Sequence, residues 1–350
     1  MDLRAFIDRL SAAGRLRRVE QLTDWKLDIG KLIREEHVPL LFENIKDYPG
    51  ARVFSNGLVD EFCIAIALGL ENRKPRAVIR EAAKRARTAI KPVLVEQGPV
   101  LENIVEAAGI DFFKLPVPHW HPQDVGRYIG TWHLNITKDP ETGSRNLGVY
   151  RMQVVGPREA TVSTSSGSHL ARQFVKAEAM GQPLEMAVAI GVSEALMIAA
   201  SAACHFGVDE YELAGGLQNQ AVRLVKCRSI NHEVPADSEI VIEGLIKPGI
   251  RVQDGPYFDY AGKPSTNKNA FLFEATRLLF RNHPIFRGTS IGGPGAEDHQ
   301  LFALLAQLNL VDFHGAPAKQ WVQNQFLKMR WFRPFQFAGS VGSIIRKVRN

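Results

Sequence analysis

From residue 128 onward, the sequence alternates between apolar and polar residues as the strands of a half-buried sheet do. Residues 131–137 alternate, residues 138–144 (K-D-P-E-T-G-S) form a turn, and residues 147–155 make a second apolar-rich run. Two such runs around a glycine-containing turn predict an antiparallel hairpin. Similar runs follow at 161–165, 186–191, 222–227, 238–244 and 270–280. An antiparallel sheet at the centre of the fold is therefore the main constraint that the sequence sets.

The second run contains one unusual residue, Arg151. Side chains alternate along a strand, so a continuous strand over 147–155 would place Arg151 on one face with Leu147, Val149, Gln153 and Val155. An arginine between valines on one face is half-buried or points into a cavity.

Helices are expected between the strands. Asp2 caps an amphipathic segment over residues 2–13. Further helices are expected at 78–90, at 101–109 ending at Gly109, at 169–180 ending at Gly181, at 194–203 and at 300–308. Three prolines in residues 114–122 preclude a helix and mark a domain boundary. The class is α+β, with an antiparallel sheet or split barrel at its centre.

Composition excludes several protein classes. The longest apolar run, 195–203, is too short for a membrane span, which takes about 20 residues. The N-terminal segment lacks the features of a signal peptide. Three scattered cysteines support neither a disulfide framework nor a zinc site, and a reducing cytoplasm is the expected location.

The positive charge is concentrated in the C-terminal tail. The net charge is +6, and the residues after Asp312 carry seven lysines and arginines and no acid. Residues 331–337 (W-F-R-P-F-Q-F) add a contiguous aromatic run, which is typical of an interface. A solvated or subunit-contacting tail is favoured over nucleic-acid binding, and a homo-oligomer is expected.

Six polar residues stand out in segments otherwise made of strands, turns and helix starts. These residues are Asn146, Arg151, His169, Glu210, Asp254 and Asp259. His169 follows a run of small polar residues and begins a helix, where free N–H groups attract phosphate. Asparagine, histidine and glutamate together could bind a hard metal ion that bridges to phosphate. For Glu210 the alternative is a structural charge at a helix start.

The two aspartates flank G-P-Y-F, and each could simply belong to a turn or a strand end. The catalytic interpretation depends on Arg151. An arginine beside one carboxylate would keep it ionised, and a second carboxylate in a desolvated pocket could hold a proton.

Other motifs carry less weight. The glycine-rich residues 292–298 match neither a P-loop nor a dinucleotide fingerprint. The H-W-H motif at 119–121 could ligate a metal, but packing or a hydrogen-bonded pocket lining is favoured among so many prolines.

Several motifs in the same order resemble the UbiD family of prenylated-FMN-dependent decarboxylases. They are L-P-V-P-H-W-H-P, N-L-G-V-Y-R, S-G-S-H, V-D-E-Y, V-P-A-D-S-E-I-V-I-E-G, D-G-P-Y-F-D and G-G-P-G-A-E-D-H-Q-L. The resemblance covers residues 1 to about 310. It implies an N-terminal α/β region (1–115), a split β-barrel resembling flavin reductases that binds the cofactor (116–310), and a divergent basic tail (311–350) in place of the family's C-terminal domain.

The resemblance also implies roles for particular residues. Asn146, His169 and Glu210 match ligands of a divalent ion, Mn²⁺ or Mg²⁺, and Ala199, Ala200 and Ala202 match a K⁺ site. Arg151, Asp254 and Asp259 match a catalytic arginine and two acids. The full set implied to bind the cofactor is Asn146, Val149, Tyr150, Arg151, Ser168, His169, Ala200, Ala202 and Glu210.

The implied activity is the reversible, non-oxidative decarboxylation of an aromatic, heteroaromatic or α,β-unsaturated acid through a covalent adduct with prenylated FMN. A flavin prenyltransferase would supply the cofactor. The alternative is a degenerate paralogue that binds flavin or serves as a non-catalytic subunit. Two departures from the family bear on this choice: Asp254 stands where glutamate is usual, and the chain diverges after about Leu310.

Overall fold

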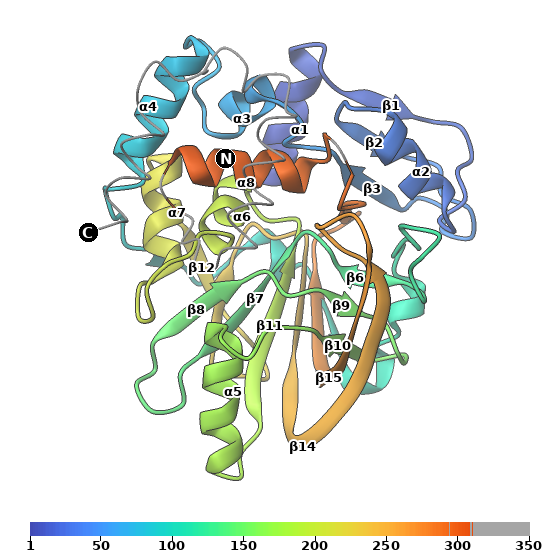
Figure 1. Ribbon diagram of the computed structural model, residues 1–350, viewed down its shortest axis with the longest axis vertical. Helices are drawn as coiled ribbons and strands as arrows, with labels where there is room; N and C mark the ends of the chain where they lie inside the picture. Colours follow the sequence, from blue (N-terminus) through green and yellow to red (C-terminus); the bar gives the residue numbers. More distant parts are fainter. Residues whose placement is uncertain (294, 309, 311–350) are drawn as a thin grey trace. The chain divides into compact units, whose positions relative to one another are not determined.

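The computed structural model describes residues 1–293, 295–308 and 310 (Figure 1). They belong to one compact unit, Met1–Val311. The basic tail and its aromatic run, on which the oligomer prediction depends, lie outside the described residues.

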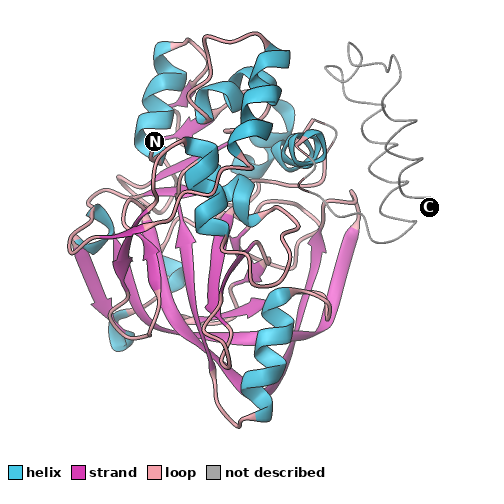
Figure 2. Ribbon diagram, turned by 90° about the vertical axis from the view of Figure 1, so that its left-hand side faces the viewer, coloured by secondary structure: helices cyan, strands magenta, loops and turns pink. Residues whose placement is uncertain are grey.

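The central feature is a curled sheet whose neighbouring strands all pair antiparallel (Figure 2). Its order is β10-β15-β14-β11-β7-β8, with β5 paired to β15. The strands are β5 (Asn103–Glu106), β7 (His133–Lys138), β8 (Arg145–Gly148), β10 (Glu159–Val162), β11 (Leu184–Ile190), β14 (Ile240–Phe258) and β15 (Pro264–Phe280). Register shifts along the two longest strands, β14 and β15, accompany the curl, because bulges bend and twist a strand.

Three smaller sheets complete the strands. The orders are β1-β2-β3-β16, β13-β12-β4 and β6-β9. Their bounds are β1 (Arg17–Val19), β2 (Leu40–Phe42), β3 (Arg52–Ser55), β4 (Val93–Leu94), β6 (Tyr128–Gly130), β9 (Met152–Gln153), β12 (Arg223–Lys226), β13 (Glu233–Pro235) and β16 (Ile285–Arg287).

Most helices gather at one end of the curled sheet, and α5 packs against β7, β8, β11 and β14 (Figures 1 and 2). The helices are α1 (Leu3–Ala12), α2 (Asp28–Glu35), α3 (Glu61–Ala67), α4 (Pro75–Arg85), α5 (His169–Ala179), α6 (Glu194–Ala200), α7 (Glu210–Gln218) and α8 (Glu297–Gln307). Short 3₁₀ turns lie at Pro99–Leu101, Ala107–Gly109 and Phe112–Lys114. The predicted α+β class is confirmed.

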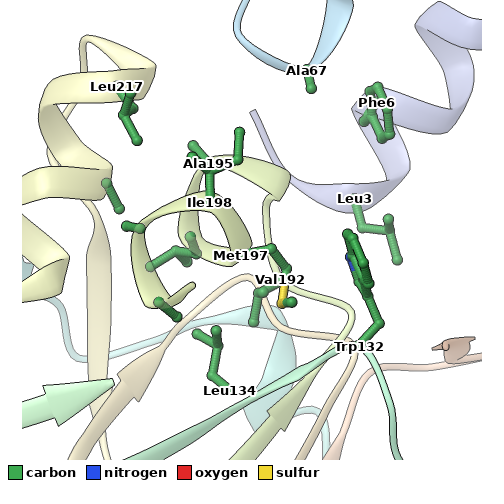
Figure 3. Packing of buried hydrophobic residues seen from close by; sticks show 14 of the residues in the cluster. Leu3, Phe6, Ala67, Trp132, Leu134, Val192, Ala195, Met197, Ile198 and Leu217 are labelled. Carbon is green, nitrogen blue, oxygen red and sulfur yellow. The ribbon is translucent and has the colours of Figure 1, made fainter. Parts of the chain in front are cut away.

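Helix α6 lies at the centre of the helical layer, and every one of its residues is buried. Its Met197 and Ile198 lie among Leu3 of α1, Leu217 of α7 and Leu134 of β7 (Figure 3). The small residues of this helix, such as Ala195 and Ala199, allow such close packing on all sides. Most of the helical layer therefore shares a core with one face of the sheet, and the other face packs in a second cluster with α5.

The predicted hairpin forms, but its second strand is shorter than expected. Strands β7 and β8 pair as far as Asn135 opposite Gly148, and the chain then leaves the sheet before β9 pairs with β6. In the gap, the Tyr150 N–H donates to Asn135 Oδ1 (3.0 Å), and the Tyr150 carbonyl lies 3.1 Å from His133 Nε2. Side chains thus replace the strand partner here. The prediction of one continuous face carrying Arg151 is wrong.

The predicted helix over 101–109 is also wrong. Asn103–Glu106 form β5, which pairs with Arg277–Phe280 of β15, and only Ala107–Gly109 make a single 3₁₀ turn. The helical pattern is short, and tertiary pairing with β15 overrides this local preference.

No helix in the described part of the chain is long and apolar enough to cross a membrane. Cys63, Cys204 and Cys227 are free thiols.

Candidate active site

Two helix starts and one strand carry the predicted metal ligands. Ser168 caps α5 by accepting the Ala171 N–H (3.1 Å), and His169 is the first residue of that helix. Glu210 is the first residue of α7. Both helices contact β8, which carries Asn146. The helix starts were predictable from the sequence, because small polar caps precede both.

Tyr150 lies over β8, two residues beyond Gly148. Burial raises the pKa of its phenol, the Leu170 backbone and the Asn146 and Ser168 side chains lower that pKa, and the charge of Glu210 raises it. Gly148 makes the arrangement possible, because a Cβ there would lie 2.4 Å from the Tyr150 ring. The tyrosine therefore packs against β8, the strand that carries Asn146, and the His169 ring packs edge-on against Phe206 at 5.1 Å.

Glu210 is a buried carboxylate, with 2% of its surface exposed. Its Oε2 accepts the Leu147 N–H (3.0 Å), and burial raises its pKa to about 7. The nearby Arg145 pairs with Asp209 instead (2.6 Å), and no ion pair involves Glu210 within the described residues. A helix-start charge that served the dipole alone would face water, so the structural alternative for Glu210 explains its position poorly.

The chemistry of these residues fits a divalent cation. Two oxygen donors and one imidazole are suitable ligands, and burial lowers the pKa of His169, which keeps its ring neutral for coordination. The start of the eleven-residue helix α5 would favour an anion such as a phosphate beside that cation.

Arg151 and Asp254 form the predicted contact. Arg151 Nε lies 2.6 Å from Asp254 Oδ1, and Arg151 Nη1 donates to the Ser265 hydroxyl (2.6 Å). The Thr161 hydroxyl donates to Asp254 Oδ2 (2.5 Å), and the guanidinium lies 4.9 Å from the centre of the Tyr257 ring. Both carboxylate oxygens of Asp254 are thus occupied. Sequence reasoning missed Thr161, Ser265 and Tyr257, which β10, β15 and β14 contribute.

The expected direction of the Asp254 pKa needs correction. From the sequence we expect Arg151 to lower this pKa, but the side chain is fully buried and burial raises the pKa above its ordinary value. The charge of Arg151 and the hydrogen bonds from Thr161 and Arg151 offset part of this effect. Desolvation outweighs the attraction of the arginine because the carboxylate lies deep in the sheet, away from water.

Asp259 follows directly after β14 and is half-buried. Its Oδ1 accepts the Ala261 N–H (2.9 Å), so the carboxylate stabilises its own turn, and none of its hydrogen bonds in the described structure joins it to Arg151. Gly292 approaches closely, since a Cβ there would lie 2.1 Å from the Asp259 carbonyl oxygen. The glycine-rich segment thus packs against the turn that carries Asp259.

The H-W-H motif serves packing and hydrogen bonding, as the favoured interpretation predicted. His119 Nε2 lies 3.0 Å from the Asp124 carbonyl oxygen, and the His121 ring stacks on Phe258 at 3.8 Å. Asp124, which sequence reasoning missed, is buried and receives two backbone N–H groups. The one sequence feature that could have indicated Asp124 is its position just after the proline-rich segment 114–122.

The remaining predicted residues lie near these groups. Val149 packs against the main core, and Ala200 is the last residue of α6, which contacts both α7 and β8. The Ala199 carbonyl accepts the Ala202 N–H (3.1 Å).

Comparison with known sequences identifies two domains. The model of the 3-octaprenyl-4-hydroxybenzoate carboxy-lyase Rift-related domain matches residues 91–294, and that of the N-terminal domain of the same enzyme matches residues 7–86. A protein of Synechocystis sp. is 31% identical, over 88% of this chain and 66% of its own length. One of Aquifex aeolicus is 33% identical, over 89% and 71%. The chain thus spans about two thirds of the length of these relatives.

Solved structures agree in fold. An evolved dimeric form of the UbiD-class enzyme HmfF from Pelotomaculum thermopropionicum, in complex with prFMN, gives a TM-score of 0.81 at 33% identity, over 87% of this chain and 70% of that one. Vanillic acid decarboxylase from Sedimentibacter hydroxybenzoicus gives 0.82 at 30%, over 87% and 67%. The two domain matches, the sequence relatives and these structures agree, and the chain belongs to the UbiD family.

Proposed function

We propose that the protein is a carboxy-lyase that uses prenylated FMN to decarboxylate, reversibly and without oxidation, an aromatic, heteroaromatic or α,β-unsaturated carboxylic acid. The similarity to HmfF, which was solved with prFMN, and to a vanillic acid decarboxylase supports the cofactor and the substrate class. The split-barrel description of residues 116–310, flanked by α/β regions, belongs to the same proposal.

One observation carries it. Tyr150 and Arg151 are consecutive, yet Tyr150 packs over Gly148 of β8, the strand that carries Asn146, while Arg151 contacts Asp254. The break between β8 and β9 thus joins a site suited to a cation and a phosphate to a site suited to a carboxylate. A flavin nucleotide with a carboxylic acid beside its ring requires these two sites as neighbours.

Asn146, His169 and Glu210 would bind Mn²⁺ or Mg²⁺, which would hold the cofactor phosphate, and backbone carbonyls near Ala199, Ala200 and Ala202 would bind K⁺. When bound, prenylated FMN supplies the electron sink that lets the bond to the carboxylate carbon break. The contributions of the chain are binding and proton transfer.

Arg151 would hold the substrate carboxylate, because its guanidinium can donate two parallel hydrogen bonds. Asp254 and Ser265 fix the orientation of Arg151 through Nε and Nη1. Asp259 would then deliver a proton to the carbon that loses carbon dioxide, and its hydrogen bond to Ala261 would have to open for that step.

That hydrogen bond is also the observation that favours the second candidate. If the Asp259 carboxylate stays in its turn, the protein would bind flavin and serve as a subunit without turnover of its own.

The test is co-expression with a flavin prenyltransferase, followed by mass measurement of the extracted flavin. The holoprotein would then be assayed for carbon dioxide release, and for deuterium exchange into product analogues, across aromatic and acrylic acids. We expect a flavin heavier than FMN and turnover of at least one acid. Flavin without turnover would favour the non-catalytic subunit, and no retained flavin would overturn the proposal.

A further inference from the structure

The segment containing the H-W-H motif connects the N-terminal region to the end of β14. On the N-terminal side, the His119 N–H donates to the Trp25 carbonyl (3.1 Å), and Arg34 Nη1 donates to the Trp120 carbonyl (2.6 Å). On the other side, the Val125 N–H donates to the Pro256 carbonyl (2.8 Å). The segment is therefore anchored on both sides, and its second contact lies between Asp254 and Asp259.

Asp124 makes the contact closest to Asp259. Its Oδ1 accepts the N–H of Phe258 (2.8 Å), the residue directly before Asp259, and its Oδ2 accepts the His121 N–H (3.1 Å). The His121 ring lies nearly parallel to that of Phe258, at 6°. One carboxylate thus fixes the Tyr257–Phe258 peptide, which lies one residue before the proposed proton donor.

Burying the Asp124 carboxylate costs free energy, so its position calls for a reason such as this contact. The side chain is buried, and burial raises its pKa to about 7. The charges of Arg34 on α2 and of Arg151 act on it in the opposite direction, and its own charge raises the pKa of the facing Tyr128 and Tyr257 phenols. An asparagine would cap the local turn about as well and without the cost of burying a charge. What asparagine cannot do is accept two N–H groups, one on each oxygen.

We propose that Asp124 is a positioning residue that holds the Tyr257–Phe258 peptide, one residue before Asp259, in place beside the Arg151–Asp254 pair. Its effect on catalysis rests on the proposed function, whereas its effect on the mobility of the 254–262 segment does not. Nothing in the local sequence pairs these residues, which are 134 positions apart.

The main variant is Asp124→Asn, which leaves one acceptor oxygen for two donors. We expect faster amide hydrogen exchange in peptides covering 254–262, measured by mass spectrometry on the full chain. In the holoenzyme we expect kcat to fall about 10- to 100-fold, because small misplacements of a reacting group cost up to about 100-fold, with KM and flavin content unchanged.

The matched control is Asp139→Asn. Asp139 is also buried and also accepts two backbone N–H groups, from Glu141 and Thr142 (both 3.0 Å and both on Oδ1), but it lies in the β7–β8 turn, where its Oδ2 accepts from Lys176 (2.8 Å). This variant should leave exchange over 254–262 and kcat unchanged. A second variant, Asp124→Glu, keeps both acceptor oxygens and should recover part of kcat. It also serves as the test if Asp124→Asn does not fold.

The outcomes separate the two claims. If the wild-type holoenzyme has no turnover, the proposed function fails and the exchange measurement alone decides the role of Asp124. Unchanged exchange over 254–262 in folded Asp124→Asn overturns the positioning role. If the wild type is active and Asp124→Asn shows faster exchange over 254–262 with unchanged kcat, Asp124 has no role in catalysis.

Discussion

Two buried carboxylates, Glu210 and Asp254, show how differently the two halves of the site are completed. Both are nearly or fully inaccessible to solvent, and burial raises both pKa values. Asp254 has an arginine at 2.6 Å and a threonine hydroxyl at 2.5 Å. Glu210 has backbone N–H donors and no ion-pair partner among the residues that the structure describes.

The two halves differ in whether the chain itself supplies a cation to the buried carboxylate. An unpaired buried carboxylate costs free energy until it takes up a proton or a cation. The half around Arg151 carries its own cation, so the chain alone can maintain its geometry. Among the described residues no cation pairs with Glu210, so in the proposed function a metal ion would supply the missing charge. The following predictions test that contrast.

The largest effect is expected at Asp259. Asp259→Asn should lower kcat by about 10²–10⁴ without loss of flavin, because it removes a proton donor and leaves the metal ligands intact. Asp111→Asn is the matched control, since Asp111 also accepts the N–H two residues ahead (2.9 Å) in a turn away from the site. Turnover of Asp259→Asn at the wild-type rate would assign the proton to another group.

Next in size is the pH dependence of metal binding. Because the pKa of Glu210 is raised to about 7, a metal ion must displace a proton below that pH. The affinity of the metal-free protein for Mn²⁺, measured by calorimetry, should fall about tenfold for each pH unit below 7.

The metal-free protein provides the matching stability measurement. The contribution of Glu210 to the free energy of unfolding is fully present below its ordinary pKa of 4.5 and is lost as pH rises to about 7. Saturating Mn²⁺ should remove this loss. An affinity for Mn²⁺ that does not change between pH 5.5 and 8 would contradict the assignment of Glu210 as a ligand.

The smallest effect is expected for Asp254→Glu. The longer side chain keeps the charge beside Arg151 but must shift within a fully buried position, so we expect a change in kcat within about tenfold. Asp254→Asn should cost more, because it removes the charge that orients Arg151. Equal losses of kcat in Asp254→Glu and Asp254→Asn would show that Asp254 acts through packing and not through its charge.

The half of the site with His169 and Glu210 was easier to predict from the sequence than the half with Arg151. The first depends on local helix caps, and the second depends on pairing between distant strands. Ser168 and Asp209 cap helices, and a cap is a local pattern, so the positions of His169 and Glu210 could be inferred. The continuous strand through Arg151 could not be excluded in the same way, because nothing local shows that Asn135 and His133 replace the strand partner of Tyr150.

Burial was equally hard to predict from sequence. The sequence placed Arg151 beside Asp254 but not the depth of that contact, so the direction of the Asp254 pKa was wrong. Asp124 was missed because its partner, Phe258, is distant in the chain. The β5 strand was missed for the same reason, since its identity comes from pairing with β15.

The central claim is that a cation at Glu210 completes the cofactor site. The most direct measurement is the flavin and divalent metal content of protein co-expressed with a flavin prenyltransferase, for the wild type, Glu210→Gln and Glu212→Gln. Glu212 lies in the same first turn of α7 and serves as the control. We predict that the wild type and Glu212→Gln retain flavin and metal together, and that Glu210→Gln loses both. Wild-type flavin occupancy in Glu210→Gln after removal of metal by a chelator would contradict the account.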